Sequence, residues 1–127
     1  MNDPWLITEM TDYRALDVWK LAHSVTVSIY RATAAYHSDE RFGLMAQTRR
    51  AAVSIPSNIA EGAGRFSDRD NRRFLAIAAG SVNETEYQLL LARELGYLDP
   101  TTWGDLSGDL SRVRSMLIRL RQWLADG

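Results

Sequence analysis

The 127-residue sequence contains no cysteine, and it has only two histidines and one lysine. Without cysteine there can be no disulfide, no thiolate zinc site and no cysteine nucleophile, which fits a reducing cytoplasm. No apolar run approaches the roughly 18 residues that a membrane-spanning helix needs. The first ten residues, MNDPWLITEM, lack the basic start and the apolar centre of a secretory signal peptide. We therefore expect a cytoplasmic globular protein with no membrane partner.

The net charge is small, −1, so the composition as a whole gives no sign of nucleic-acid binding. The charges are unevenly spread along the chain. Residues 41–73 hold seven Arg against three acidic residues, and residues 112–127 hold four Arg against one Asp. The segments 1–40 and 74–111 are acidic in balance. Such alternation is typical of bundle helices that attract their neighbours, and we favour this interpretation over a basic face for phosphates.

The apolar residues recur with the period of an α-helix, and glycine and proline interrupt this period at few places. The pattern predicts four helices, over residues 13–36, 40–63, 67–96 and 100–124. Because short loops make neighbouring helices antiparallel, we expect an all-α fold, an up-down-up-down four-helix bundle. This domain covers residues 12–127. It follows an N-terminal tail, residues 1–11, whose Trp5 either lies free or docks on another surface.

Each predicted helix has one apolar face that is expected to line the core. Pro56 lies inside the second helix, where proline removes a backbone donor and clashes with the preceding turn, so we expect a kink there. The predicted inner residues are Val18, Ala22, Val25, Ile29, Ala32 and Tyr36; Leu44, Ala51, Ile55 and Ile59; Phe74, Ile77, Ala78, Ser81, Thr85, Gln88, Leu89, Ala92 and Leu95; and Leu106, Leu110, Val113, Leu117, Leu120 and Leu124.

Residues that cap helices stand near the predicted boundaries. We expect Ser38 or Asp39 to cap the second helix and Gly62 with Gly64 to end it. Ser67, with Asp70 three residues further on, has the spacing of a capping box for the third helix. The predicted cap of the fourth helix is Thr101 or Thr102, and Gly96 is expected to end the third.

The motifs of catalysis and cofactor binding are missing from the sequence. Di-iron bundles use Glu-x-x-His pairs, but Lys20 and Ala34 stand three residues before His23 and His37. The single lysine leaves no phosphate-binding loop of the Walker type, and the Gly-Ala-Gly at residues 62–64 is better explained as a helix end. We therefore expect no enzymatic activity, no cofactor and no metal.

A line of polar residues, here called the polar seam, runs along the second predicted helix and continues on the third. Its spacing of three or four residues places the members on each helix on a shared face. The seam could form a site, but we favour a structural hydrogen-bond network between helices or subunits, with Arg49 or Arg50 paired to Glu84. On the second helix this spacing links Arg50, Ser54, Ser57, Asn58, Glu61 and Arg65, and on the third it links Ser81, Glu84 and Gln88. The candidate residues of the polar seam are Arg49, Arg50, Ser54, Asn58, Glu61 and Glu84.

A second group of charged residues, here called the arginine cluster, lies where the second and third predicted helices meet. Positive charge near a helix N-terminus opposes the helix dipole, so the cluster suggests an external anion or an acidic neighbour. We favour a solvated turn in which Asp68 and Asp70 are the local partners. Otherwise the cluster is the candidate contact for RNA, DNA or a nucleic-acid enzyme. It consists of Arg65, Arg69, Arg72 and Arg73.

Residues 47–62, QTRRAAVSIPSNIAEG, closely resemble the signature of the four-helix bundle proteins encoded by intervening sequences of bacterial 23S rRNA genes. Shorter matches flank the signature, and they extend the resemblance to residues 13–124. These matches are LDVW at 16–19, FGL at 42–44, RFL at 73–75, AAGS at 78–81 and LGYL at 95–98.

The resemblance implies an antiparallel four-helix bundle that assembles into a homopentamer and has no established enzymatic activity. A related group, the accessory proteins of diversity-generating retroelements, comprises pentameric bundles that bind nucleic acid and a reverse transcriptase. Those proteins tend to be basic, whereas this chain is slightly acidic. We therefore expect a non-enzymatic pentameric ring that acts as a scaffold or interaction module. The alternative is a nucleic-acid-binding accessory protein, in which a ring multiplies the phosphate contacts of the arginine cluster.

Overall fold

The computed structural model describes residues 12–126, and within this range the chain forms four long α-helices and no β-strand. The predicted all-α four-helix bundle is confirmed, whereas the N-terminal tail with Trp5 lies outside the described residues. Two short 3-10 turns accompany the helices. The elements are η1 (Tyr13–Ala15), α2 (Asp17–Thr33), η2 (Ser38–Glu40), α3 (Leu44–Ala63), α4 (Asp68–Glu94) and α5 (Pro100–Asp126).

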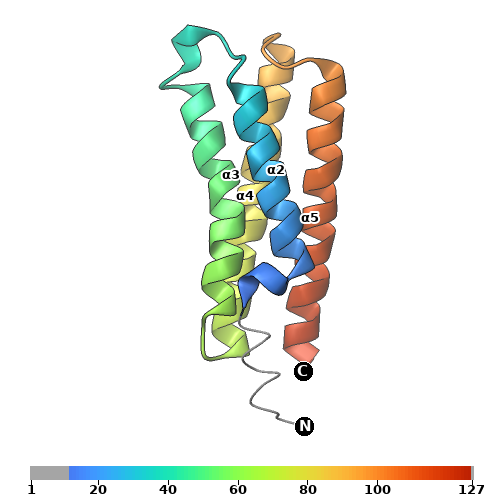
Figure 1. The fold of residues 1–127 in the computed structure, drawn as a ribbon. Helices are drawn as coiled ribbons and strands as arrows, with labels where there is room; N and C mark the ends of the chain where they lie inside the picture. The colour runs from blue at the N-terminus through green and yellow to red at the C-terminus, as the bar shows by residue number, and fades with distance from the viewer. Residues whose placement is uncertain (1–11, 127) are drawn as a thin grey trace.

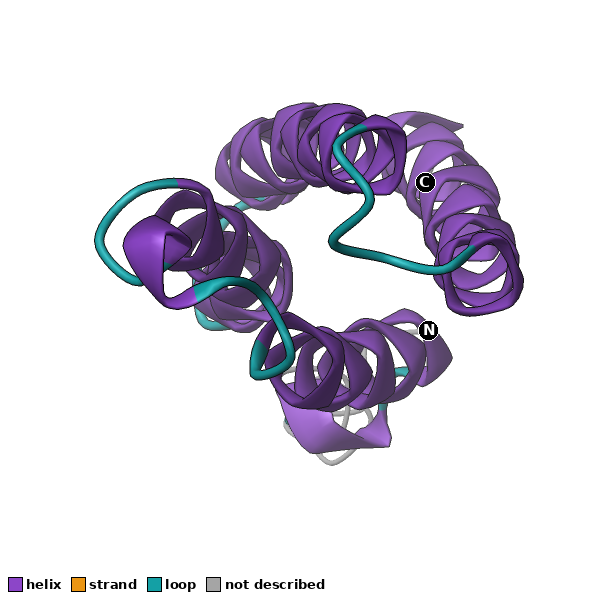
Figure 2. Ribbon diagram, turned by 90° about the horizontal axis from the view of Figure 1, so that it is seen from above, coloured by secondary structure: helices purple, strands orange, loops and turns teal. Residues whose placement is uncertain are grey.

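The four helices form one bundle in which each helix packs mainly against two others. Helix α2 contacts α3 and α5, and α4 contacts the same two helices from the other side. In Figure 1 the chain rises through α2, descends through α3, rises through α4 and descends through α5. Seen from the end, the helices surround a single core (Figure 2). Helix α3 continues through the buried Pro56 without a break, and the kink stays a prediction.

The first predicted helix is shorter in the structure than the sequence pattern indicates. The chain begins with η1, which Asp12 caps by accepting a hydrogen bond from the Arg14 backbone N–H at 3.1 Å. Leu16 is extended, so α2 starts only after it. At the other end α2 stops at Thr33, yet Tyr36 beyond it is still buried in the core. The apolar period of the sequence therefore extends to Tyr36, although the helix ends at Thr33.

The start of α3 differs from the prediction because a residue further along the chain supplies the cap. Ser38 and Asp39 lie in η2, and the N-cap position of α3 is Gly43, which has no side chain. The free N–H of Leu44 instead donates to Glu40 Oε1 at 3.1 Å. The other carboxylate oxygen of Glu40 accepts a hydrogen bond from the Tyr97 hydroxyl at 3.1 Å. Glu40 thus joins the start of α3 to the turn that follows α4.

The remaining helix ends follow the prediction in part. Ser67 caps α4, since its Oγ accepts a hydrogen bond from the Asp70 N–H at 3.1 Å. Gly96 follows α4 with a φ of 81°, a conformation that favours glycine. The predicted threonine caps of α5 are wrong, because Asp99 accepts from the Thr102 N–H at 2.8 Å and Pro100 is the first helical residue.

The core consists mainly of the predicted faces of the four helices, but on α4 two predicted residues are exposed and two buried residues were not predicted. On α4, Leu75 and Val82 are fully buried, whereas Ile77 and Leu95 are 44% and 52% exposed. Two apolar stripes overlap on this helix, and packing against α3 and α5 selects the stripe that contains Leu75. The predicted inner residues Ala78, Ser81, Thr85, Gln88, Leu89 and Ala92 are buried.

Candidate functional site

The centre of the polar seam is a hydrogen-bond network between α3 and α4. The hydroxyls of Ser54 and Ser81 lie 2.7 Å apart, which joins the two helices directly. The side-chain amide of Asn58 donates to the Ser54 carbonyl at 2.8 Å and to the Ser54 hydroxyl at 2.9 Å. All three side chains are at least partly buried, so these bonds fix how the two helices face each other.

The Arg49 side chain forms hydrogen bonds with α2. Its Nε donates to the fully buried Thr33 hydroxyl at 2.8 Å, and its terminal nitrogen donates to the Tyr30 carbonyl at 2.9 Å. The guanidinium also lies 4.7 Å from the centroid of the Tyr30 ring. The last carbonyls of a helix have no partner within the helix. Arg49 therefore satisfies the C-terminal end of α2 and ties it to α3.

Within the described residues of one chain, neither Arg49 nor Arg50 pairs with Glu84, and a pairing between subunits stays a prediction. Arg50 is exposed and makes no hydrogen bond or ion pair with the residues that the structure describes. Glu84 is also exposed, and it accepts a hydrogen bond from the Gln88 amide at 3.3 Å. Glu61 faces Arg65 at 3.8 Å. Arg50, Glu61 and Glu84 therefore lie on the outside of the bundle. Arg49 connects α3 to α2, and the Ser54–Ser81 hydrogen bond connects α3 to α4.

Two further threonines are buried between the helices and were not among the candidate site residues. The Thr26 hydroxyl donates to the Ala22 carbonyl at 2.7 Å and reaches the Ala52 carbonyl on α3 at 3.2 Å. Thr48 is fully buried on the apolar face of α3, and its hydroxyl has no hydrogen-bond partner among the described residues. Thr26 could have been identified from the sequence, because a threonine hydroxyl at a core position of a helix can bond to a backbone carbonyl.

The signature sequence also contains a point of close approach between α3 and α4. A Cβ atom on Gly62 would lie 2.6 Å from Asn71 Oδ1, and 3.1 Å from both the Asn71 carbonyl oxygen and Phe74 Cβ. No residue larger than glycine fits there without a shift of α4. Ile55, Pro56 and Ile59 of the same stretch are buried in the core. The most distinctive residues of this sequence therefore hold two helices together.

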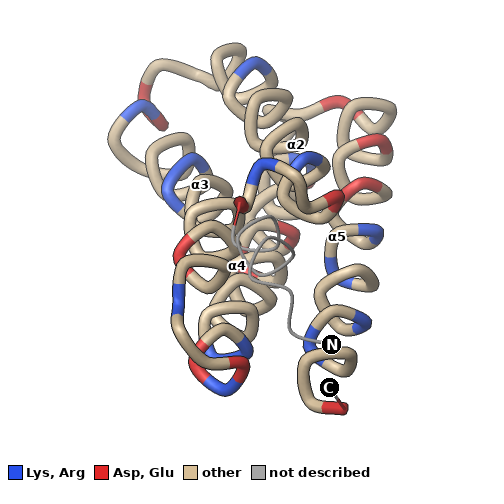
Figure 3. Tube along the Cα trace, turned by 60° about the horizontal axis from the view of Figure 1, so that its bottom comes forward, with Lys and Arg blue, Asp and Glu red and all other residues tan. Residues whose placement is uncertain are grey.

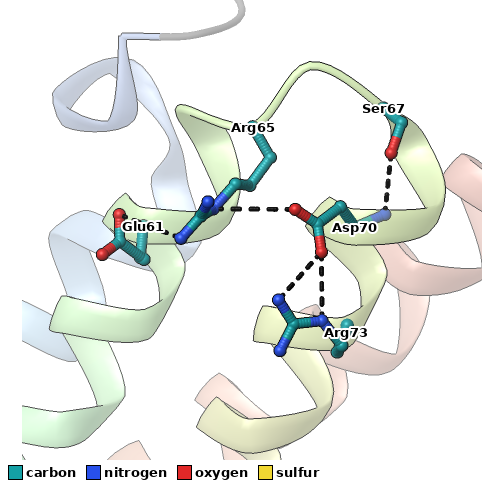
Figure 4. A network of polar contacts seen from close by, with 5 residues as sticks. All are labelled: Glu61, Arg65, Ser67, Asp70 and Arg73. Carbon is teal, nitrogen blue, oxygen red and sulfur yellow. Dashed lines mark hydrogen bonds and ion pairs between the residues drawn. The ribbon is translucent and has the colours of Figure 1, made fainter.

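Two of the four arginines in the cluster, Arg65 and Arg73, are paired with acidic residues of the chain, as Figure 4 shows. The Asp70 carboxylate accepts hydrogen bonds from Arg73 at 2.9 and 3.0 Å, and Arg65 lies 3.7 Å away on its other side. Both guanidinium groups lie 4.5 Å from the centroid of the Phe74 ring. This geometry agrees with the favoured interpretation of local pairing with Asp70.

The other two arginines of the cluster differ from each other. Arg69 is exposed at a shallow hollow beside Ser67. Arg72 is half-buried, and its Nε atom has no hydrogen-bond partner among the described residues. Along α5, two aspartates precede four arginines and Asp126 ends the helix, as the red, blue and red segments of α5 in Figure 3 show. Neither the first nor the last turn carries a charge that complements the helix dipole.

The shifted pKa values trace to helix caps and to one buried phenol. Hydrogen bonds from backbone N–H groups lower the pKa of Asp12 and of Asp99. A hydrogen bond to Glu40 raises the pKa of Tyr97, and burial raises the pKa of Tyr36 to about 12. These groups stabilise the ends of helices, and their geometry is that of structural contacts rather than of an acid–base pair.

Two hollows lie between pairs of helices. The larger, about 480 Å³, lies between α4 and α5 and contains the ion pair of Arg114 with Glu86 beside Trp103. The smaller, about 370 Å³, lies between α2 and α3 and is lined by Trp19 and His23 among others. No group of three His, Asp or Glu side chains in the described range could hold a metal ion. No helix of this range is long and apolar enough to cross a membrane.

Comparison with known proteins assigns the fold to a family. The family model described as 23S rRNA-intervening sequence protein matches residues 14–119. The chain belongs to this family. A similar solved structure is the crystal structure of a protein with unknown function from the S23 ribosomal protein family of Bacteroides thetaiotaomicron VPI-5482. It has a TM-score of 0.74 and 26% sequence identity, and the match covers 82% of this chain and 97% of that chain. No curated protein matches the chain.

In this member of the 23S rRNA-intervening sequence protein family, the signature residues have structural tasks. Ser54 bonds α3 to α4, Asn58 donates to Ser54 within α3, Ile55 and Ile59 fill the core, and Gly62 allows the helices to approach. The signature thus specifies the bundle. Residues that could act on another molecule must lie on the outer faces of the helices and at the turns between them.

Proposed function

We propose that this protein is a non-enzymatic scaffold or interaction module that works as a homo-oligomer, a pentameric ring in the cytoplasm. The observation that carries the proposal is the set of large apolar side chains on the outer surface of α4 and α5. Tyr87, Ile118 and Trp123 are 62%, 57% and 54% exposed. Contiguous apolar patches on a protein surface mark places where another protein binds, and we take these three side chains as the candidate members of such a patch.

Two further observations support a structural role. The partly buried polar groups that resemble a site, such as Ser54 and Asn58, are occupied by hydrogen bonds to each other and, at Ser54, to Ser81 of α4. The family match and the similar crystal structure carry no named activity, because that structure is described as a protein with unknown function. The pentameric form comes from the family resemblance of the sequence. An oligomer also gives a reason for apolar residues that the bundle itself leaves uncovered.

Size-exclusion chromatography with light scattering tests this proposal. The wild-type protein should elute with the mass of five chains at micromolar concentration. Ile118→Ser or Trp123→Ser should lower that mass, because each removes an apolar side chain from the proposed subunit interface. Ser115, an exposed residue of α5 that is already small, provides a control through Ser115→Ala. A single-chain mass for the wild type would remove the proposal.

A second function is supported by the turn between α3 and α4. Phe66 is fully exposed there, directly beside Arg65 and close to the exposed Arg69. Proteins bind single-stranded nucleic acid with aromatic rings and neighbouring arginines, because bases stack on the rings and phosphates pair with the cations. The alternative function is therefore an RNA-binding accessory protein, such as a partner of a reverse transcriptase. The pairing of Arg65 and Arg73 with Asp70 weakens this alternative.

A gel-shift assay with structured RNA at low salt tests the alternative. RNA binding predicts a shift that weakens as salt is raised and that is lost in the double variant Phe66→Ala with Arg69→Ala. Phe42, which is 87% exposed in the turn before α3, gives a matched control through Phe42→Ala. No shift of the wild-type protein, or an equal loss in both variants, argues against binding at this turn.

A further inference from the structure

The hollow between α2 and α3 is an apolar groove that the described part of the chain leaves open. It has a volume of about 370 Å³, which falls within the range of ligand-binding pockets. One edge is aromatic: the rings of Tyr13 and Trp19 lie 5.0 Å apart, and Trp19 is stacked on His23 at 4.9 Å. The other edge is formed by α3, where Val53 is 38% exposed and Pro56 is buried.

The chain enters the bundle at one end of this groove. Tyr13 lines the groove and belongs to η1, which packs against both α2 and α3. Eleven residues precede Asp12, and they include the apolar run Pro4-Trp5-Leu6-Ile7. Ile7 is six positions from Tyr13, so the connecting chain can span about 20 Å when extended. The groove extends along α2 from Trp19 to Thr26, which is about 10 Å.

We propose that Trp5, Leu6 and Ile7 of the same chain fill this groove. The segment is the apolar part of the residues before Asp12, and it is tethered within reach of an apolar groove of matching size. Burying an indole and two aliphatic side chains is favourable in proportion to the apolar area removed from water. The tether also raises the local concentration of the segment to a level that a free peptide does not reach. The proposal holds for one chain and does not depend on the proposed oligomer.

Fluorine NMR of the full-length protein tests this docking, because the chain has four tryptophans and no cysteine. All tryptophans are replaced with 5-fluorotryptophan, and each signal is assigned with its own Trp→Phe variant. A spin label on the single cysteine of Asn2→Cys then broadens signals close to the tail. Docking predicts that the Trp19 signal loses most of its intensity, while Trp103 in the hollow between α4 and α5 keeps its signal.

Variants separate docking from the mere nearness of the tail to Trp19. Trp5→Ala on the tail, or Val53→Arg on the exposed edge of the groove, should restore the Trp19 signal. Met10→Ala, outside the apolar run, should leave the broadening unchanged. If Trp5→Ala has no effect on the broadening, the proposal is wrong.

A mixture of spin-labelled chains without fluorine and unlabelled chains with fluorine shows whether the tail binds its own chain. Broadening of Trp19 in that mixture would mean that a second copy supplies the segment, and this would overturn the same-chain proposal. Light scattering on the same sample reports the oligomer separately, so each of the two proposals can fail without the other.

Discussion

Replacing Gly62 with alanine should destabilise the bundle, although alanine is the better helix former. In a helix interior this change gains about 1 kcal/mol when nothing else is altered. At Gly62 the new methyl group would lie 2.6 Å from Asn71 Oδ1, a side-chain atom that can move away. It would also lie 3.1 Å from the Asn71 carbonyl oxygen and from Phe74 Cβ, and these belong to or adjoin the α4 backbone. Overpacking of this kind costs about 1–3 kcal/mol, so we expect a net loss of about 1 kcal/mol.

The same change at Gly108 should have the opposite sign. Gly108 lies inside α5 at an exposed position, and a Cβ atom there meets nothing within 4 Å. Gly108→Ala should therefore stabilise the protein by about 1 kcal/mol, the full difference in helix propensity. The two variants should differ by about 2 kcal/mol although they are chemically identical changes.

Urea unfolding followed by circular dichroism measures both variants against the wild type. The slope of the transition should be unchanged, so that a shift of the midpoint reports stability alone. If Gly62→Ala raised the midpoint as much as Gly108→Ala does, α3 and α4 would not approach as closely at this point as the structure indicates. That result would refute the structural explanation of the signature glycine.

Three further predictions concern single side chains, and each is measured by urea unfolding. Arg49→Ala should cost about 1–2 kcal/mol, because it removes two charged hydrogen bonds to the end of α2. Arg50→Ala should stay within about 0.5 kcal/mol of the wild type, and equal effects would contradict the conclusion that only Arg49 binds α2. Asn58→Ala should cost about 1 kcal/mol, since it removes the amide that donates to the Ser54 carbonyl and hydroxyl, and an unchanged midpoint would argue that the Asn58 amide has no structural task. The folded pKa of Tyr36, about 12, lies above the ordinary value of 10, so its contribution to stability is complete below about pH 10 and is lost as the pH rises toward 12. Tyr36→Phe should make the midpoint fall less steeply over that range, and an equal fall in both proteins would show that burial does not act on this phenol.

The agreement between sequence and structure is closest where one periodic signal dominates. On α5 the heptad residues Leu106, Leu110, Val113, Leu117 and Leu124 are all buried. On α4 two apolar stripes compete, and the choice between Ile77 and Leu75 depends on the shapes of α3 and α5 that face them. Periodicity in the sequence identifies the apolar faces of a helix, and packing against the neighbouring helices determines which face is buried.

The polar contacts were harder to predict because they depend on helix rotation and on loops. Arg49 and Arg50 are about 100° apart around α3. Only Arg49 binds the C-terminal end of α2, because that end lies on its side of α3. Glu40 and Asp99 act as caps because the turns before α3 and α5 place their carboxylates near free N–H groups. Nothing in the spacing of these residues distinguishes them from the neighbouring Asp39 or Thr102.

The central claim, that the bundle is one subunit of a ring, is tested most directly by native mass spectrometry of the wild-type protein. One chain has a mass of 14.4 kDa, so a homopentamer has a mass of about 72 kDa. We predict a dominant species of that mass at micromolar concentration, with no nucleic acid attached. A dominant species of 14.4 kDa would contradict the claim. It would leave the exposed apolar residues of α4 and α5 to be explained by a different partner.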